Sequence, residues 1–342
     1  MMNKQKKKLI YLSMALLLVI LCLLLTGCGS KNDSQSAQLP ALQDKDPEGA
    51  NDRVNADQSD DVVSVDTPFG EVQTARQQNA SGQLSDGVNY VLYQDGELML
   101  YGSPISCRLS NEQKLKSQLD KIYKLSFGEG VTTVGEHACE GLDKVEQVDF
   151  SNDTTTVAEY AFSNCSALET VTWGGLESIG EYAFNGCTSL RILTLNENMR
   201  NISSHAFDGC TGLKTVELGD NIQQMGMNVF SGCSAMNTLR INADISDYAF
   251  SGCTGLSEVS VGNPSKRIGN NAFSGCTNLK FLSVSDTIVE IGDGAFDGCT
   301  GLTSISIPQS VTNIGKKVFQ GCSALKEISI PATIEKISEY AF

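Results

Sequence analysis

A single column of phenylalanines, repeated along most of the chain, constrains the fold more than any other feature of the sequence. Nine of the 13 phenylalanines occupy it, and successive members are 23 residues apart except for one spacing of 22 and one of 20. A period in the low twenties is typical of stacked supersecondary units that share one core. The column begins with a cysteine and comprises Cys139, Phe162, Phe184, Phe207, Phe230, Phe250, Phe273, Phe296, Phe319 and Phe342.

A second column, of cysteines, follows the first by three residues and holds eight of the 12 cysteines. Neighbouring members would lie one strand step apart with parallel Cβ directions, which favours a ladder of small buried hydrophobic side chains over disulfides. Some disulfide pairing and a metal site are the alternatives, although the paired Cys-x-x-Cys motif common in zinc sites is missing. Cys107 lies outside the column, whose members are Cys165, Cys187, Cys210, Cys233, Cys253, Cys276, Cys299 and Cys322.

Each repeat divides into two halves, as residues 302–324 illustrate. The first half alternates apolar and polar residues from Leu302 and predicts a short strand. The second half spaces Ile314, Val318 and Cys322 four residues apart, which predicts a short helical turn. A single strand cannot bury its apolar face, so the units must stack. The sequence therefore predicts an α/β repeat solenoid of about ten 23-residue units over residues 122–342.

A different pattern precedes the repeats, over residues 87–121. Residues 89–102 alternate around Asp95-Gly96 and predict a β-hairpin with a two-residue turn. Residues 110–121 predict a short helix that begins at Ser110. We expect this hairpin and helix to cap the first repeat, which would otherwise expose its core.

The first 27 residues have the features of a targeting segment. Four lysines precede an apolar run of 17 residues, Leu9 to Leu25. The run ends in Leu25-Thr26-Gly27-Cys28, which resembles the lipobox of bacterial lipoproteins, where the peptidase cuts before a lipidated cysteine. The resemblance implies lipidation of Cys28 and a membrane anchor formed by its acyl chains. An ordinary secretory signal or an uncleaved anchor is the alternative.

Residues 28–86 separate this segment from the predicted cap. They are acidic, rich in Gln, Asn, Ser and Asp, and contain one phenylalanine. Such a composition cannot bury enough apolar surface to offset the entropy of an ordered chain. We therefore expect a disordered linker that spaces the membrane from the folded domain.

The repeat motif resembles that of a known family. Leu-x-x-Ile-x-Ile-Pro, followed by Val-x-x-Ile-Gly and Phe-x-Gly-Cys, is similar to the BspA-type (Treponema pallidum-type) leucine-rich repeats of bacterial surface proteins. The resemblance covers about residues 122–342. It implies a curved solenoid with a strand-lined face, which the predicted lipid anchor would hold at the extracellular face of the bacterial cytoplasmic membrane. It also implies adhesion to, or binding of, a protein or glycan of a host or neighbouring cell.

Catalytic and nucleic-acid functions find little support in the sequence. His137 and His205 fall at a position that other units fill with Tyr or Asn, which favours variable surface residues over catalytic ones. Serine-hydrolase, zinc-protease and nucleotide-binding motifs are missing, so we expect no enzyme activity, no metal and no cofactor. The formal charge of −15 disfavours nucleic acid as a partner.

The outward positions of the predicted strands are the candidate binding surface. Their central column is mostly short hydroxyl residues, which suits a glycan or an extended protein better than a small molecule. We expect Glu217 and Arg240 to pair across neighbouring strands. Ile192 and Phe281 would be apolar residues facing solvent and are candidate anchors for a ligand. The central column comprises Ser126, Asp149, Thr172, Thr194, Glu217, Arg240, Ser260, Ser283, Ser306 and Ser329.

Two functions are consistent with this organisation. The first is a membrane-anchored extracellular adhesin or binding protein that uses the strand face. The second is the recognition and anchoring part of a longer cell-surface enzyme whose catalytic domain is absent from this chain. The sequence ends at Phe342 inside a unit, so we expect a truncated array. Nothing in the sequence predicts an oligomer.

Overall fold

The computed structural model describes residues 62–65 and 72–342, with side chains from residue 76 onward. These residues belong to the second of two compact units, residues 59–342. The predicted signal segment 1–27, Cys28 and most of the predicted linker lie outside the described residues. A short antiparallel pair, β1 (Val62–Val65) and β2 (Val72–Ala75), is the first described element.

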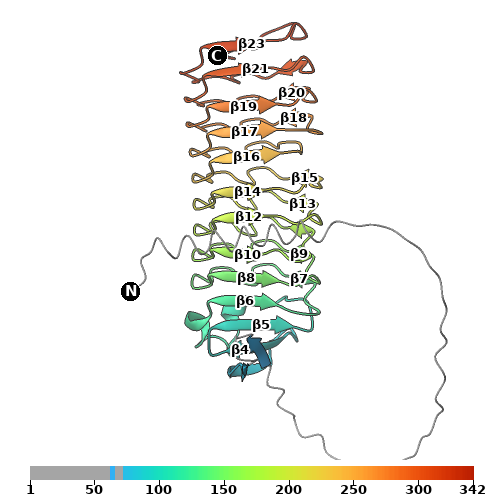
Figure 1. Ribbon diagram of the computed structural model, residues 1–342, viewed down its shortest axis with the longest axis vertical. Helices are drawn as coiled ribbons and strands as arrows, with labels where there is room; N and C mark the ends of the chain where they lie inside the picture. Colours follow the sequence, from blue (N-terminus) through green and yellow to red (C-terminus); the bar gives the residue numbers. More distant parts are fainter. Residues whose placement is uncertain (1–61, 66–71) are drawn as a thin grey trace, which may run out of the picture. The chain divides into compact units, whose positions relative to one another are not determined.

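The repeats form a solenoid in which each turn of the chain adds one strand to a parallel ladder (Figure 1). The predicted repeat solenoid is therefore confirmed. We call the surface formed by the outward side chains of this ladder the strand face. Its strands are β6 (Lys124–Phe127), β8 (Gln147–Phe150), β10 (Thr170–Thr172), β12 (Ile192–Thr194), β14 (Thr215–Glu217), β16 (Thr238–Ile241), β17 (Glu258–Val261), β19 (Phe281–Val284), β21 (Ser304–Ser306) and β23 (Glu327–Ser329).

The second half of most units contributes a two-residue strand to another parallel ladder. Two sheets make up this second ladder, and a single bridge between Ile245 and Ile268 precedes the later one. Its strands are β7 (Thr133–Val134), β9 (Thr156–Val157), β11 (Ser178–Ile179), β13 (Asn201–Ile202), β15 (Gln224–Met225), β18 (Arg267–Ile268), β20 (Glu290–Ile291) and β22 (Asn313–Ile314).

The predicted helical turn of each unit is wrong. Ile314 lies in strand β22, and the residues up to Cys322 form turns. A residue two positions before each phenylalanine has a positive φ, such as 53° at Tyr160, which an α-helix cannot contain. The backbone of the turn alternates between two kinds of bond. Phe162 N–H donates to the carbonyl of Ala183 in the next unit at 2.7 Å, whereas Ser163 N–H donates to Tyr160 in its own turn at 3.1 Å. Turn bonds three residues back and bonds between units thus replace the helical ladder.

The phenylalanine column forms the centre of the core. From Phe162 to Phe342 the rings stack with centroids 5.1–5.8 Å apart, close to the spacing of neighbouring strands. Seven of these rings, from Phe162 to Phe296, are fully buried. Each buried phenylalanine contributes about 1.5–3 kcal/mol through removal of apolar surface from water. Because every ring touches the next, the column links all the units into one continuous core.

The predicted hairpin is confirmed as β4 (Asn89–Tyr93) and β5 (Glu97–Tyr101). Its loop has three residues rather than two, and Gly96 at the end of the loop takes a φ of 83°. A left-handed glycine is the usual way to close a three-residue hairpin loop. Strand β5 then runs parallel to β6, so the hairpin continues the first repeat's sheet. That it caps the array stays a prediction.

Two further expectations for this region are corrected. Strand β3 (Gln78–Gln83) pairs with β4, so the fold begins inside residues 28–86, which were predicted to be a linker. The predicted helix 110–121 is replaced by two 3-10 turns, η1 (Leu109–Asn111) and η2 (Leu119–Lys121). Glu112 adopts an extended backbone and its carboxylate accepts a bond from Ser85 N–H at 3.3 Å, which interrupts any helix there.

Candidate functional site

The strand face carries the predicted ligand-binding residues in the predicted orientation. Strand registers place the central column in line, for example Thr194 beside Glu217 and Ser260 beside Ser283. Two large apolar side chains on β12 and β19 point into solvent, Ile192 with 58% and Phe281 with 66% of its surface exposed. Burying such surface against a partner would be favourable, and their role in binding stays a prediction.

Glu217 and Arg240 are neighbours in register but do not pair. Neither residue forms an ion pair within residues 76–342, where side chains are described. The carboxylate of Glu217 instead accepts a hydrogen bond from the hydroxyl of Thr194 at 3.3 Å. The predicted cross-strand ion pair is therefore wrong. Both side chains are exposed, so hydration competes well with a single contact between them.

The strand-face ladder is interrupted twice, and each interruption has a hollow beside it. The sheet containing β10 ends there and a new one begins at β12; a third begins at β21 after β19. A hollow of about 620 Å³ lies at the first interruption and includes Ile192 and Trp173 in its lining. One of about 390 Å³ lies at the second and includes Phe281 and Lys280. The two exposed apolar residues therefore mark the two breaks.

The first interruption has a visible cause in the sequence. Trp173 fills the position that Leu195 takes in the next unit, and its indole packs against Phe184 and Phe207 at centroid distances of 5.3 and 6.1 Å. The unit is also one residue shorter than most, through Gly174 and Gly175. A bulky ring beneath a strand followed by a shortened loop prevents β10 and β12 from keeping a regular register. The second interruption occurs in a unit of ordinary length, and nothing in the structure explains it.

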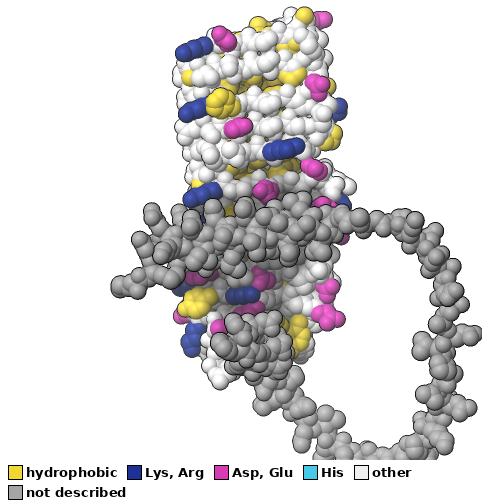
Figure 2. Space-filling view, in the orientation of Figure 1, with side chains coloured by type: hydrophobic (Ala, Val, Ile, Leu, Met, Phe, Trp, Pro, Cys, Tyr) yellow, Lys and Arg dark blue, Asp and Glu magenta, His cyan; other side chains and the backbone are white. Residues whose placement is uncertain are grey.

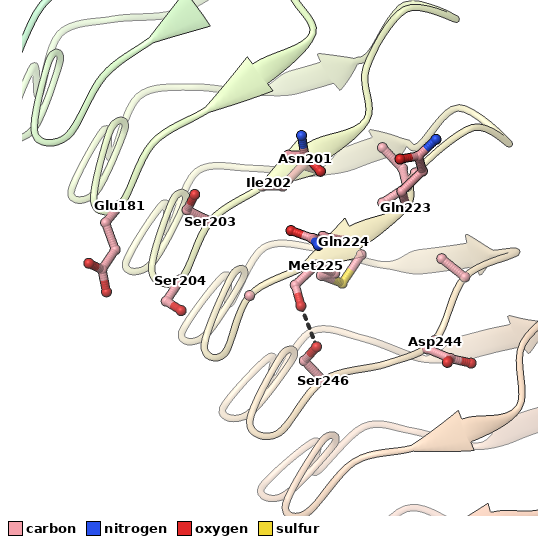
Figure 3. Close-up of a pocket in the computed structure, with 13 residues that line it drawn as sticks. Glu181, Asn201, Ile202, Ser203, Ser204, Gln223, Gln224, Met225, Asp244 and Ser246 are labelled. Carbon is pink, nitrogen blue, oxygen red and sulfur yellow. Dashed lines mark hydrogen bonds between the residues drawn. The ribbon is translucent and has the colours of Figure 1, made fainter.

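A third hollow, of about 630 Å³, lies beside the second ladder and was missed by sequence reasoning (Figure 3). It forms where the 20-residue unit lacks part of its loop, so that the ladder stops at β15. Polar side chains including Asn201, Ser203 and Gln224 line it, and Ser246 donates a hydrogen bond to the carbonyl of Met225. The short spacing between Phe230 and Phe250 was the signal that could have located it.

The cysteine column is buried as predicted for small hydrophobic side chains. Each thiol also donates to a backbone carbonyl of the core, as Cys210 Sγ does to Phe184 at 3.2 Å. Burial in apolar surroundings raises the pKa of Cys165, Cys210 and Cys253 to about 12. Since the thiolate is the reactive and metal-binding form, these groups are poorly suited to nucleophilic chemistry. Within the described residues, no cluster of three or more His, Cys, Asp or Glu could hold a metal ion.

Both histidines belong to a stack of aromatic rings in the turns of the repeats, at the position two residues before the phenylalanine column. His137, Tyr160, Tyr182 and His205 stack face to face with centroids 4.5–5.0 Å apart. His137 Nδ1 lies 2.7 Å from Glu140, and His205 Nδ1 lies 2.9 Å from Asp208. The histidines are thus partly buried members of a repeated structural column, held in place by their neighbours rather than free on the surface.

Basic side chains lie along one edge of the strand face, at the levels of β14, β19 and β23 (Figure 2). Lys214, Lys280 and Lys326 each directly precede one of these strands, and Arg191 directly precedes β12. In the same column the earlier units carry acids, Glu146 and Glu169. This edge of the strand face therefore carries acids in the early units and bases, separated by uncharged residues, in the later ones. No helix in the described part of the chain is long and apolar enough to cross a membrane.

These features define a leucine-rich-repeat solenoid with an exposed strand face. The family described as BspA type Leucine rich repeat region matches residues 114–242 and 243–342 with six copies. The chain belongs to this family. No functionally curated protein matches the sequence.

Solved structures of bacterial leucine-rich repeat proteins are similar to the chain. The protein of T. pallidum is 20% identical with a TM-score of 0.44, covering 58% of this chain and 87% of its own. A protein of Bacteroides ovatus is 20% identical with a TM-score of 0.41, covering 77% and 90%. A leucine rich cell surface protein of Faecalibacterium prausnitzii is 18% identical with a TM-score of 0.31, covering 73% and 94%.

Proposed function

We propose that the protein is a membrane-anchored extracellular adhesin, which binds a protein or glycan of a host or neighbouring cell on its strand face. The observation that carries the proposal is the exposure of Ile192 and Phe281, each beside a hollow at a break in the ladder. Isolated exposed apolar residues are common on protein surfaces. Two on the same face, each beside a hollow that could receive a partner's side chain, favour recognition.

The solenoid supports this role because it is a rigid platform. Strand-face residues are held at fixed spacing by the stacked core beneath them, so a ligand meets preorganised contacts. Membership of the BspA-type family supports a binding role in general terms, and the resemblance of residues 25–28 to a lipobox supports anchoring through Cys28. Two acyl chains would suffice for stable attachment to a membrane.

Binding is tested with the full chain, purified in detergent, on arrays of matrix proteins, mucins and cell-wall glycans. The double variant Ile192→Thr/Phe281→Ser gives each position a residue type found at the same position in neighbouring units. We expect the parent to bind at least one class of array spot and the double variant to lose it. Met227→Ser, which removes an exposed apolar residue on another surface column, is the matched control. Equal binding by the double variant would refute the strand face as the site.

Anchoring is tested separately by the variant Cys28→Ala in bacterial cells supplied with labelled palmitate. We expect the parent protein to incorporate label and fractionate with membranes. The variant should remain unlabelled because the thiol that carries the diacylglyceryl group is gone. Membrane fractionation without label in both proteins would favour the uncleaved-anchor alternative.

A further inference from the structure

The cations of the strand face differ in their partners along the array. Near the first repeat, Lys124 Nζ lies 2.6 Å from Asp149 and 3.5 Å from Glu97, and Arg76 contacts Asp95 and Glu97. Farther along, none of the described carboxylates pairs with Lys214, Arg240 or Lys280; Arg191 has only a 3.9 Å contact with Glu169. The cations of the first part are thus neutralised within the protein, and those of the later part are not.

The unneutralised cations lie between the two apolar anchors. From β12 to β19 the strands and the residue directly before each of them carry four basic residues, Arg191, Lys214, Arg240 and Lys280, against two acidic ones, Glu217 and Glu258. This surplus of two positive charges belongs to a chain with a formal charge of −15. A locally positive surface on an acidic protein attracts an acidic partner and disfavours a basic one.

The spacing of the anchors fits an extended polypeptide. Ile192 and Phe281 occupy aligned positions on strands four steps apart, which is about 19 Å at the usual strand spacing. An extended chain advances about 3.3 Å per residue, so about six residues cover this distance. Because side chains of an extended chain alternate between two sides, residues i and i+6 point to the same side. The geometry therefore allows both anchors to be met at once.

We propose that the strand face between β12 and β19 binds an extended acidic polypeptide that lies along the solenoid axis. Two apolar side chains of this partner, at positions i and i+6, pack against Ile192 and Phe281 beside the hollows. Acidic side chains between them meet Lys214 and Arg240. This inference rests on the proposed function, since it names the partner class for the same surface.

The probe that tests it is a synthetic 11-residue peptide with leucines at positions 3 and 9, glutamates at positions 5 and 7, and serine or glycine elsewhere. One control moves the second leucine to position 8, which places the leucines on opposite sides of an extended chain. Another replaces both glutamates by lysine. Trp173 is the chain's one tryptophan and lines the first hollow, so its fluorescence reports docking there.

We expect saturable quenching or a spectral shift with the probe and binding at least about tenfold weaker with either control peptide. Phe281→Ser and Ile192→Thr should each lower the affinity for the probe peptide by about tenfold, whereas Met227→Ser should leave that affinity unchanged. A higher salt concentration should weaken binding of the glutamate-containing probe, because salt screens the exposed cations of the protein. Equal affinity for the two leucine spacings would overturn the two-anchor arrangement, and equal affinity for the lysine peptide would overturn the acidic partner.

The outcome also separates this inference from the proposed function. Strand-face-dependent binding to an array of proteins or glycans, with no binding of the probe, would overturn the acidic-polypeptide inference and leave the adhesin in place. Displacement of the parent protein from an array spot by an acidic glycan, but not by the probe peptide, would have the same meaning. Failure on both the arrays and the probe would overturn both proposals.

Discussion

The phenylalanine column and the central column of the strand face pass through the same units, yet they differ in residue type and in burial. The first repeats one residue type, buried from Phe162 to Phe319 and stacked ring on ring. The second changes from serine to aspartate, threonine, glutamate and arginine while remaining mostly exposed. The core fixes how the units stack, because a cavity there is costly. The face is free to vary, since exposed side chains contribute little to stability.

The largest effect that tests this comparison is expected from Phe207→Ala. The variant should lose about 3–5 kcal/mol in the free energy of unfolding, because it opens a cavity between the rings of Phe184 and Phe230. Phe281→Ala, on the strand face, should change it by no more than about 0.5 kcal/mol. Denaturant unfolding followed by circular dichroism measures both. Similar losses for the two variants would break the contrast between core and face.

An intermediate effect is expected from alkaline pH, which acts on the core through its thiols. Burial raises the pKa of Cys253 to about 12 and of Cys322 to about 11, against an ordinary value of 9.0. The fold therefore favours the protonated thiol. The stability that the protonated thiols contribute to the folded state is complete below pH 9, the ordinary pKa of the unfolded thiol. It is lost as the pH rises from there through the pKa of the folded state.

The measurement is the denaturation midpoint between pH 8 and 10.5, which should fall, and Cys253→Ala should make the fall shallower. At pH 8 a thiol reagent should label the cysteine column only after the protein is unfolded. Rapid labelling of the native column, or a constant midpoint over that range, would contradict the burial of these thiols.

The smallest effects concern the charges of the strand face. Arg240→Gln should leave the free energy of unfolding within about 0.5 kcal/mol of the parent, because Arg240 has no ionic partner in the described residues. Lys124→Gln removes contacts with Asp149 and Glu97 and should cost up to about 1 kcal/mol. The same unfolding assay compares the two. A larger loss for Arg240→Gln would show that the later cations are structural, which would weaken the case for an acidic partner.

Sequence periodicity was sufficient to predict the unit length, the buried columns and the outward direction of Ile192 and Phe281. Alternation also predicted the hairpin from residue 89 to 101, because its pattern is local. The turn halves were predicted as helical because Val318 and Cys322 have helical spacing. Their actual form depends on left-handed residues and on bonds to the next unit, which a single repeat does not reveal.

The candidate site was less accessible to sequence reasoning. Strand β3 contains no large apolar residue and is ordered by backbone pairing with β4, so its side chains give no periodic signal. Hollows at ladder breaks depend on register between units. Trp173 and the spacings of 22 and 20 residues gave a signal for two of them, while the break between β19 and β21 left no trace in the sequence.

The interruptions of the two ladders never fall between the same two units. Where β10 and β12 part, β11 still pairs with β13; where β19 and β21 part, β20 still pairs with β22. Where the second ladder stops after β15, the strand face stays joined through Glu217 and Arg240. The breaks of the two ladders are therefore staggered along the array, and neighbouring units at each break stay joined by the other ladder. Under a sideways force, the array would thus have no plane along which its units could shear without breaking backbone hydrogen bonds.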